Sequence, residues 1–298
     1  MLTPALKKKT KASLPANESN FMQIKVYSPS NPLLKKYIEC IYILTHTSEE
    51  KPAKYITFPS IFTIVSMSEK SKTINKGNQL IIQQCDDNDV ETNLVSDFNK
   101  PVYVQYEGKI NEITIYFKPL AINAFLRHDL NHYNSSNFSD FAPFEDYRKA
   151  MIEILSQQND IEKIQAIESY WLSKLAGFQH QFLETVLAEM MSEENDALTI
   201  MELCEKNAIS RTTLNKHFAR HICKTPSQFK KILKFRNAVN KYASDNAKNN
   251  LTDIAYGVDY FDQSHMTREF KSVTGFSPKE FFKRTTALEK KQIHWLFL

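Results

Sequence analysis

Glycine is scarce in this sequence: its 298 residues include only 5, and none belongs to a GxGxxG or GxxxxGK[ST] pattern. Those patterns bring the backbone close to phosphate groups, so their absence argues against a dinucleotide-binding fold or a P-loop nucleotidase. Long hydrophobic runs are missing as well. The richest apolar stretch, Ile38–Leu44, contains Glu39 and is too short to span a bilayer, so we expect no transmembrane helix and no membrane partner.

Cysteine is also rare. The residues Cys40, Cys85, Cys204 and Cys223 form no CxxC pair, which argues against a disulfide-rich secreted scaffold and against structural zinc. Residues 1–20 carry four lysines but lack the apolar run of a secretory signal. We therefore expect a cytoplasmic protein whose residues 1–20 form a flexible basic tail.

Charge is distributed unevenly along the chain. The hydrophobic share of 42% and the charged share of 24% are those of an ordinary globular protein, and the length favours two domains. From Glu193 onward, 18 lysines and arginines face 12 acidic residues, a net charge of +6, whereas the preceding part has −2. Because cationic side chains displace counterions from phosphates, the basic C-terminal third favours a nucleic-acid partner.

The first half of the chain has the pattern of a β-rich domain. Short β-branched and aromatic runs bounded by turn formers predict strands at residues 22–27, 40–45, 54–58, 61–66, 80–83, 101–106 and 110–117. Residues 104–117 are predicted to form a hairpin that turns near 107–109, with Ile113, Ile115 and Phe117 on one face.

From Leu120 the apolar period changes to 3.6. This predicts helices at residues 120–125, 144–157, 160–175 and 180–191, the second with a stripe of Tyr147, Met151 and Leu155. The chain is therefore expected to be α+β, with a β-rich N-terminal domain, trailing helices and an all-α C-terminal domain.

The C-terminal part contains an internal repeat. Residues 210–229 can be laid over residues 262–281 at a shift of 52. Ser210 and Asp262 open the two copies as N-caps, and each copy ends at a Thr/Ser-Pro that starts the next helix. The matched apolar pairs are Leu214 with Met266, Phe218 with Phe270, Pro226 with Pro278 and Phe229 with Phe281.

A shorter helix is expected before each copy, at residues 198–206 and 251–258, with turns at 207–209 and 259–261. Two helices joined by such a turn form a helix-turn-helix unit. A helix at 227–242, roughly 24 Å long, would join the two units. Two recognition helices about 34 Å apart could enter successive major grooves, so one chain could read what a dimer usually reads.

The second unit resembles the AraC/XylS family of bacterial transcription regulators. The similarity is carried by Ile254-Ala255, Asp262-Gln263-Ser264-His265, Arg268-Glu269-Phe270-Lys271 and Gly275-Phe276-Ser277-Pro278. The sequence departs from the family pattern in two places: Asp259-Tyr260 replaces its usual Gly-Phe, and Cys223 stands where glycine is usual after the first recognition helix.

The resemblance implies a sequence-specific transcription regulator with no catalysis and no cofactor. Its domains would be an effector-sensing or dimerisation domain at 21–192, a tandem helix-turn-helix domain at 193–286 and a C-terminal tail at 287–298. Double-stranded DNA would be its main partner. RNA polymerase, a small-molecule effector and a second copy of the chain would be further partners, and the residues that bind an effector are not identified.

The outward faces of the two recognition helices follow from periodicity, with Leu214 and Phe218 turned inward. Asparagine, lysine, arginine, glutamine, serine and threonine can contact base edges, while Arg211, His265 and Lys271 are predicted to hold phosphates. The alternative is an ordinary solvated helix surface. The predicted DNA-binding residues are Arg211, Thr212, Asn215, Lys216, Gln263, Ser264, His265, Thr267, Arg268 and Lys271.

Two other classes of function stay open. A DNA-repair enzyme with a fused DNA-reading domain would need a reactive cysteine, and neither Cys40 nor Cys85 has such a setting. His128 and His132 stand four apart, but without a third ligand no metal site is expected. A protein-interaction adaptor would use the helical domain on another protein, and it would bind no duplex at any salt concentration.

Overall fold

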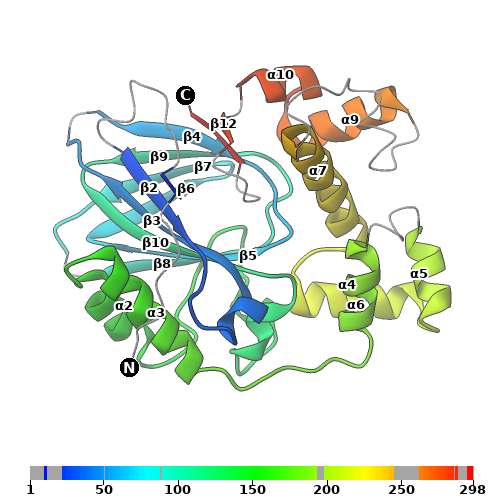
Figure 1. Ribbon diagram of the computed structural model, residues 1–298, viewed down its shortest axis with the longest axis horizontal. Coiled ribbons are helices and arrows are strands. Elements are labelled where there is room, and N and C mark those ends of the chain that lie inside the picture. Colours follow the sequence, from blue (N-terminus) through cyan, green and yellow to red (C-terminus); the bar gives the residue numbers. More distant parts are fainter. Residues whose placement is uncertain are drawn as a thin grey trace.

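The computed structural model describes residues 10–11, 22–49, 51–87, 89–192, 198–244, 262–284, 286–287 and 294–297. In these parts of the chain the strands form two sheets, and the helices from residue 183 onward stand beside them (Figure 1). This is the α+β arrangement that the sequence predicts, with β-rich structure first and helices last. The described helices include none that is long and apolar enough to cross a membrane.

The first sheet is antiparallel throughout, and β10 lies near its centre between β3 and β5. Its order is β1 (Thr10–Lys11), β2 (Met22–Tyr27), β3 (Ile38–His46), β10 (Ile110–Phe117), β5 (Thr63–Glu69), β8 (Val90–Val95) and β11 (Ser139–Asp140).

The second sheet includes a strand from the end of the chain. Its order is β12 (Thr286–Ala287), β13 (His294–Phe297), β4 (Ala53–Thr57), β9 (Val102–Glu107), β7 (Gln79–Gln84) and β6 (Ser71–Lys76), with only β7 and β9 parallel among these described pairs. β13 pairs with β4, with Trp295 opposite Thr57 and Phe297 opposite Tyr55. Part of the segment predicted to be a C-terminal tail, 287–298, thus completes a sheet of the first domain.

The predicted hairpin at 104–117 is wrong. Its two strands exist as β9 and β10, but β9 pairs with β4 and β7 in one sheet and β10 pairs with β3 and β5 in the other. Gly108, with φ of 80°, lies in the turn where the chain crosses between sheets. β10 is buried along nearly its whole length, and such a strand belongs in the middle of a sheet between two neighbours.

Most other strand predictions are confirmed within a few residues at the ends. The strands β1, β6, β8, β11, β12 and β13 were not predicted. β6 has few apolar residues, whereas β8 does alternate, with Val90, Thr92 and Leu94 buried between the half-buried Glu91 and Asn93. The predicted face of Ile113, Ile115 and Phe117 is confirmed, since all three are fully buried in one apolar cluster.

The helices of residues 120–192 are mostly where the periodicity places them. The segment predicted as helix 120–125 is a 3₁₀ turn, η2. Its N-terminal neighbour Leu120 has φ of 69°, which does not fit an α-helix. The elements in this region, together with the earlier η1, are η1 (Leu34–Lys36), η2 (Ala121–Ala124), α1 (Leu130–Tyr133), α2 (Tyr147–Leu155), α3 (Asp160–Ser173) and α4 (Leu183–Met191).

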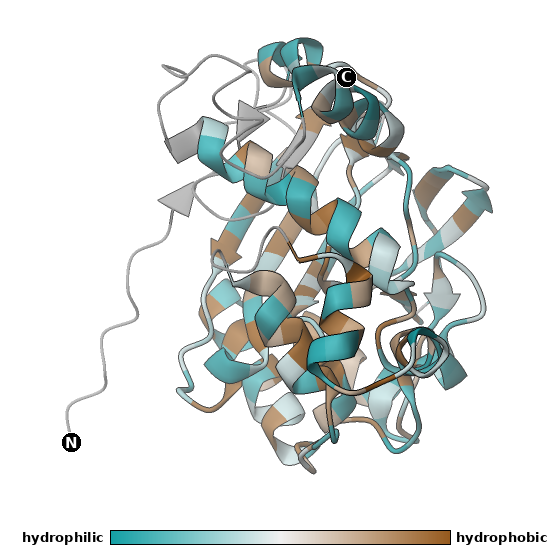
Figure 2. Ribbon diagram, turned by 90° about the vertical axis from the view of Figure 1, so that its right-hand side faces the viewer, coloured by the Kyte–Doolittle hydropathy of each residue, from teal (hydrophilic) through white to brown (hydrophobic). Residues whose placement is uncertain are grey.

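The C-terminal region contains α5 (Ile200–Lys206), α6 (Arg211–His221), α7 (Pro226–Ser244), α9 (Gln263–Thr274) and α10 (Pro278–Arg284). Figure 2 looks onto these helices and shows hydrophilic and hydrophobic residues alternating along them. This alternation is typical of amphipathic helices that bury one stripe.

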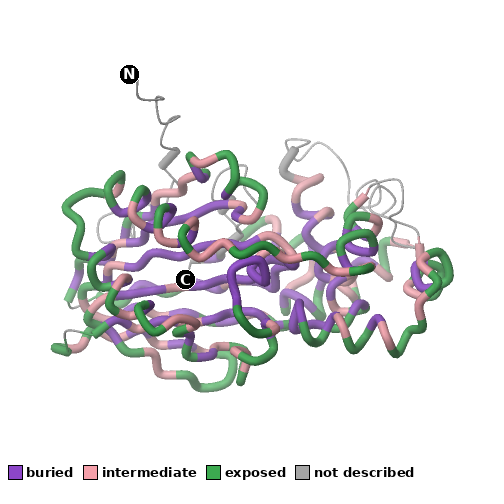
Figure 3. The backbone as a smooth tube through the Cα atoms, turned by 90° about the horizontal axis from the view of Figure 1, so that it is seen from below, coloured by how far each residue is buried: buried purple, intermediate pink, exposed green. Residues whose placement is uncertain are grey.

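Strand β3 divides the core into layers. Its residues Tyr42 and Leu44 belong to a cluster shared by the two sheets, while Ile41 and Ile43 belong to a cluster with α2 and α3. The predicted stripe of α2, Tyr147, Met151 and Leu155, is buried in that second cluster. Figure 3 shows buried residues concentrated along the strands and on the inner sides of the helices. The alternating sides of one strand thus face different partners.

A third cluster joins the second sheet to the C-terminal helices. Phe58, just after β4, contacts Phe281 of α10 edge to face with ring centroids 4.9 Å apart. Phe235 of α7 and Phe270 of α9 complete this aromatic group, with centroids 5.0 Å apart. The same cluster includes Leu296 of β13. The helical region therefore packs directly on the β-rich domain.

The N-cap of α9 offers a test of the local structure. The Asp262 side chain accepts a hydrogen bond from the backbone N–H of His265 at 2.6 Å. Asp262→Ala leaves that N–H without its acceptor, so we expect a loss of about 1 kcal/mol in the free energy of unfolding, measured by urea denaturation followed by circular dichroism. Asp262→Asn keeps an acceptor and should retain most of the stability; an equal loss in both variants would contradict the capping role.

Candidate nucleic-acid interface

Helix α6 begins at the predicted cap. The Ser210 hydroxyl accepts a hydrogen bond from the Thr213 backbone N–H at 3.0 Å, which satisfies one of the free donors of the first turn. Leu214 and Phe218 are fully buried. The predicted DNA-binding residues of this helix are all exposed to solvent: Arg211, Thr212, Asn215 and Lys216.

Helix α9 repeats this arrangement after its own cap, Asp262. Met266 and Phe270 are fully buried, as Leu214 and Phe218 are in α6. The four predicted residues that are exposed are Gln263, Ser264, Arg268 and Lys271, whereas His265 and Thr267 are half-buried.

The ring of His265 is directed along its own helix. Its Nε2 lies 3.6 Å from Oε1 of Glu269, one turn further on. A carboxylate at that distance competes with a phosphate for the imidazole, so His265 is the least accessible of the predicted phosphate contacts.

The ends of the two helices share an unusual backbone conformation. Gly275 follows α9 with φ of 77°, and Cys223, 52 positions earlier, has φ of 56°. A non-glycine residue in this left-handed region costs about 1–2 kcal/mol. Cys223 therefore adopts the conformation that Gly275 adopts at the matching position of the repeat, at a cost in backbone strain.

The helix that follows each copy starts with a reciprocal cap. The Thr225 hydroxyl accepts from Gln228 N at 3.1 Å, while the Gln228 side chain accepts from Thr225 N at 2.8 Å. Ser277 and Glu280 form the same pair before α10, at 3.4 and 3.1 Å. The capping box thus recurs at the 52-residue shift.

The two recognition helices lie toward opposite ends of α7 (Figure 1). Phe218 of α6 contacts Phe229 near the start of α7, with ring centroids 5.9 Å apart, and Phe270 of α9 contacts Phe235 further along. α7 has 19 residues, longer than the predicted 227–242, and so spans about 28 Å. The predicted helix at 251–258 and the turn at 259–261 lie outside the described residues.

The C-terminal end of α6 is docked on the N-terminal domain. Nε of Arg220 donates to Oδ2 of Asp129 at 2.7 Å, and Nδ2 of Asn123 donates to the His221 carbonyl at 2.8 Å. The predicted reading residues lie nearer the other end of the helix. One helix thus offers its N-terminal half to solvent and holds the β-rich domain with its last turn.

Two basic residues of the C-terminal region, Arg236 and Lys224, are buried in the interior rather than exposed on the surface. Nε and a terminal nitrogen of Arg236 donate to the carbonyls of Pro59 and Phe58 at 2.8 and 2.7 Å, and burial lowers the pKa of this arginine to about 10. Burial also lowers the pKa of Lys224 to about 8, while nearby Asp97 opposes that shift. Neither side chain is available to a phosphate.

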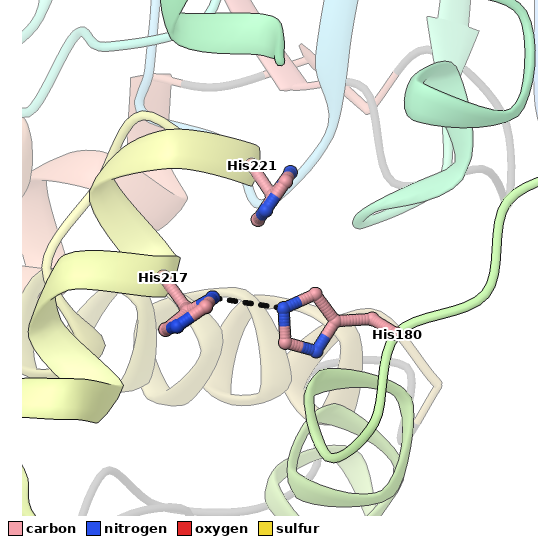
Figure 4. Close-up of side chains that lie close together, drawn as sticks. All are labelled: His180, His217 and His221. Carbon is pink, nitrogen blue, oxygen red and sulfur yellow. Dashed lines mark hydrogen bonds between the residues drawn. The ribbon is translucent and has the colours of Figure 1, made fainter.

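Three histidines form a cluster that the sequence reasoning missed. His217 and His221 project from successive turns of α6 toward His180, in the segment between α3 and α4 (Figure 4). Nε2 of His180 and Nδ1 of His217 are 2.9 Å apart and hydrogen-bonded. Burial lowers the pKa of His221 to about 4, and burial together with His217 lowers the pKa of His180, so the neutral forms of His180 and His221 are favoured.

The signal for this cluster was present in the sequence. His217 and His221 stand four apart on a predicted helix, the same spacing that drew attention to His128 and His132. The latter rings do come close, with centroids 4.5 Å apart. Within the described residues, however, the three side chains that lie close enough together to bind one metal ion are His180, His217 and His221.

A pocket lined by both apolar and polar side chains lies between the two sheets. Its free space is about 60 Å³, enough for a few water molecules, and its lining includes Tyr42, Tyr55, Tyr106 and Glu112. The Glu112 carboxylate accepts from the hydroxyls of Tyr42 at 3.1 Å, Tyr106 at 3.0 Å and Thr114 at 2.8 Å. Burial raises the pKa of Glu112, and these three hydrogen bonds only partly offset that shift.

Residues 203–284 match the family model described as a helix-turn-helix domain. A comparison with curated protein sequences finds no match.

Two solved structures of ToxT from Vibrio cholerae are among those to which this chain is similar. One covers 88% of this chain and 98% of its own, at 10% identity and a TM-score of 0.43. The other, with unsaturated fatty acid bound, covers 88% and 94%, at 12% identity and a TM-score of 0.41.

The buried carboxylate predicts a pH-dependent stability. The folded-state pKa of Glu112 lies above its ordinary value of 4.5, so the folded state holds the proton more tightly than the unfolded chain. This contribution is present in full below pH 4.5 and is lost as the pH rises through the folded-state pKa. Glu112→Gln should therefore raise the melting temperature relative to the parent at pH 7.5, and the difference should shrink toward pH 4. A difference that is the same at both pH values would contradict this assignment.

Proposed function

We propose that this chain, which carries a helix-turn-helix domain of the AraC type at residues 203–284, is a sequence-specific DNA-binding regulator of transcription. In this proposal α6 and α9 enter two successive major grooves of one duplex. The observation that carries it is the pair of capped helices toward opposite ends of α7, each with exposed polar and basic residues beside a buried apolar stripe.

On α6 the reading residues are Asn215 and Lys216, one turn after the cap. Asparagine can form two hydrogen bonds with adenine, and lysine can reach the acceptors of guanine. Thr212 offers a hydroxyl and a methyl group, and Arg211, in the first turn, would hold a phosphate. The C-terminal turn of the helix takes no part, since Arg220 is engaged by Asp129.

On α9 the main reader is Arg268, whose planar guanidinium can bond both O6 and N7 of guanine. Gln263, Ser264 and Thr267 share its side of the helix, and Lys271 would contact a phosphate. His265 would need to turn from Glu269 before it could reach one.

The N-terminal domain would sense a small molecule in the pocket around Glu112. A carboxylate surrounded by three hydroxyl donors recognises a ligand that brings hydrogen-bond donors, such as a hydroxyl or amine, and disfavours an anionic one. RNA polymerase and a second copy of the chain remain expected partners of such a regulator.

The decisive experiment is selection of bound fragments from random duplex, followed by footprinting. Two protected patches about 10 base pairs apart on one side of the helix support the two-groove arrangement. Protection of a single groove would overturn it.

Two variants of α9 distinguish a contact with a base edge from a contact with a phosphate. Arg268→Ala should lower affinity for the selected site by about 1–3 kcal/mol and relax the preference at one base position, because it removes a contact to a base edge. Lys271→Ala should weaken specific and random duplexes alike. Titrations of both variants on both duplexes measure this, and an equal loss on the two duplexes for Arg268→Ala would contradict its role.

The salt dependence of duplex affinity distinguishes a DNA-binding regulator from an adaptor that binds only protein. Phosphate contacts release counterions, so duplex affinity should fall steeply between about 50 and 200 mM salt. Fluorescence anisotropy with a labelled duplex measures the slope. An adaptor would bind no duplex even at about 50 mM salt.

A further inference from the structure

The three-histidine cluster joins two parts of the chain that are distant in sequence. His217 and His221 belong to the recognition helix α6, whereas His180 lies 37 positions before His217, in the segment that follows the β-rich domain. One ligand atom from each of the three rings lies within 4.8 Å of the others. Nothing in DNA reading requires three imidazoles on the docked side of this helix.

The distances are close to those of a coordinated ion. Imidazole nitrogens bind zinc at about 2.0–2.1 Å in a tetrahedral arrangement, which puts ligand nitrogens about 3.3 Å apart. The His180–His217 pair is at 2.9 Å, and no pair exceeds 4.8 Å. Small side-chain rotations would bring all three nitrogens onto one centre.

Neighbouring groups orient the third ring. Nδ1 of His221 lies 3.3 Å from Oδ1 of Asn123 and 3.5 Å from Oδ1 of Asp129, which leaves Nε2 for the centre of the cluster. A ligating histidine commonly donates its other N–H to a carboxylate or carbonyl oxygen in this way. Asp129 is itself fixed by Arg220, whose nitrogens are 2.6 and 2.7 Å from Oδ2.

One tautomer has to change when an ion binds. Nδ1 of His180 lies 3.4 and 3.3 Å from the backbone N–H groups of Phe182 and Leu183, so its proton is on Nε2 and points at His217. Coordination through Nε2 moves this proton to Nδ1 and gives up those two long contacts. The imidazole stays neutral, which is the form that binds metal.

We propose that His180, His217 and His221 bind one divalent transition-metal ion of the class that prefers imidazole, such as Zn²⁺, with water in the fourth position. The ion would link α6 to the segment that leaves the N-terminal domain. It would therefore oppose any movement of the first recognition helix away from that domain. The proposal replaces the expectation from sequence that the chain has no metal site.

Isothermal titration of the full chain with Zn²⁺, after removal of metals by a chelator, tests the site without DNA. We expect one ion per chain, and at least tenfold weaker binding in His180→Gln and in His217→Gln. His132→Gln is the matched control, because it removes a histidine from the other pair spaced by four and should leave the affinity unchanged. Mg²⁺, which prefers oxygen ligands, should not bind.

Further variants separate coordination from packing. His221 is buried, so circular dichroism and the melting temperature in chelator must first show that each variant folds. Asp129→Asn should weaken zinc binding about tenfold through the orientation of His221. Zinc should raise the melting temperature of the parent and of His132→Gln but not that of His217→Gln.

Two results would overturn the site. One is the absence of zinc binding by a folded parent chain, which would leave a cluster held only by hydrogen bonds. The other is zinc binding that survives His180→Gln and His217→Gln unchanged. Because DNA takes no part in these measurements, a failure of the metal site would leave the proposed reading of DNA untouched, and the reverse also holds.

Discussion

The placement of both recognition helices depends on how α7 is held against the β-rich domain. Arg236 donates to two backbone carbonyls at Phe58 and Pro59, and Phe58 itself contacts Phe281 of α10. A buried guanidinium needs such acceptors, because leaving it unsatisfied would cost several kcal/mol. The geometry of these hydrogen bonds fixes α7 in rotation as well as position. The positions of α6 and α9 follow from that placement, because α6 contacts Phe229 of α7 and α9 contacts Phe235 of α7.

The sequence could predict what is decided locally. The caps Ser210 and Asp262, the apolar stripe of α6 and the 52-residue repeat all depend on neighbours within one or two turns, so periodicity and capping residues identify them. Pairing between strands is decided by distant residues instead. Thus β9 and β10 were expected to pair across Gly108, whereas the burial of β10 on both faces places it between β3 and β5. The sequence of β6 has little apolar alternation, whereas β8 alternates Val90, Thr92 and Leu94 with polar residues, a local signal that the sequence prediction did not use.

Some features of the candidate sites are also decided locally and could be predicted, whereas others depend on distant residues. The exposed faces of α6 and α9 follow from helical periodicity, so the predicted positions Asn215, Lys216 and Arg268 are on the surface. The pocket around Glu112 could not be predicted, because its tyrosines come from separate strands of two sheets. The histidine cluster is intermediate: the spacing of His217 and His221 was visible, while only the fold brings His180 to them. One helix therefore carries the predicted DNA-binding positions in its N-terminal half and contacts the β-rich domain with its last turn.

The pairing of β13 with β4 has a consequence for biosynthesis. β4 belongs to the β-rich part of the chain, yet the strand that covers its edge consists of residues 294–297, which follow the C-terminal helices in the sequence. An uncovered edge is prone to pair with other chains. Until β13 has been translated and has paired, the nascent β-rich domain therefore exposes this edge of β4, so the second sheet cannot be complete before the C-terminal helices that precede β13 have been synthesised.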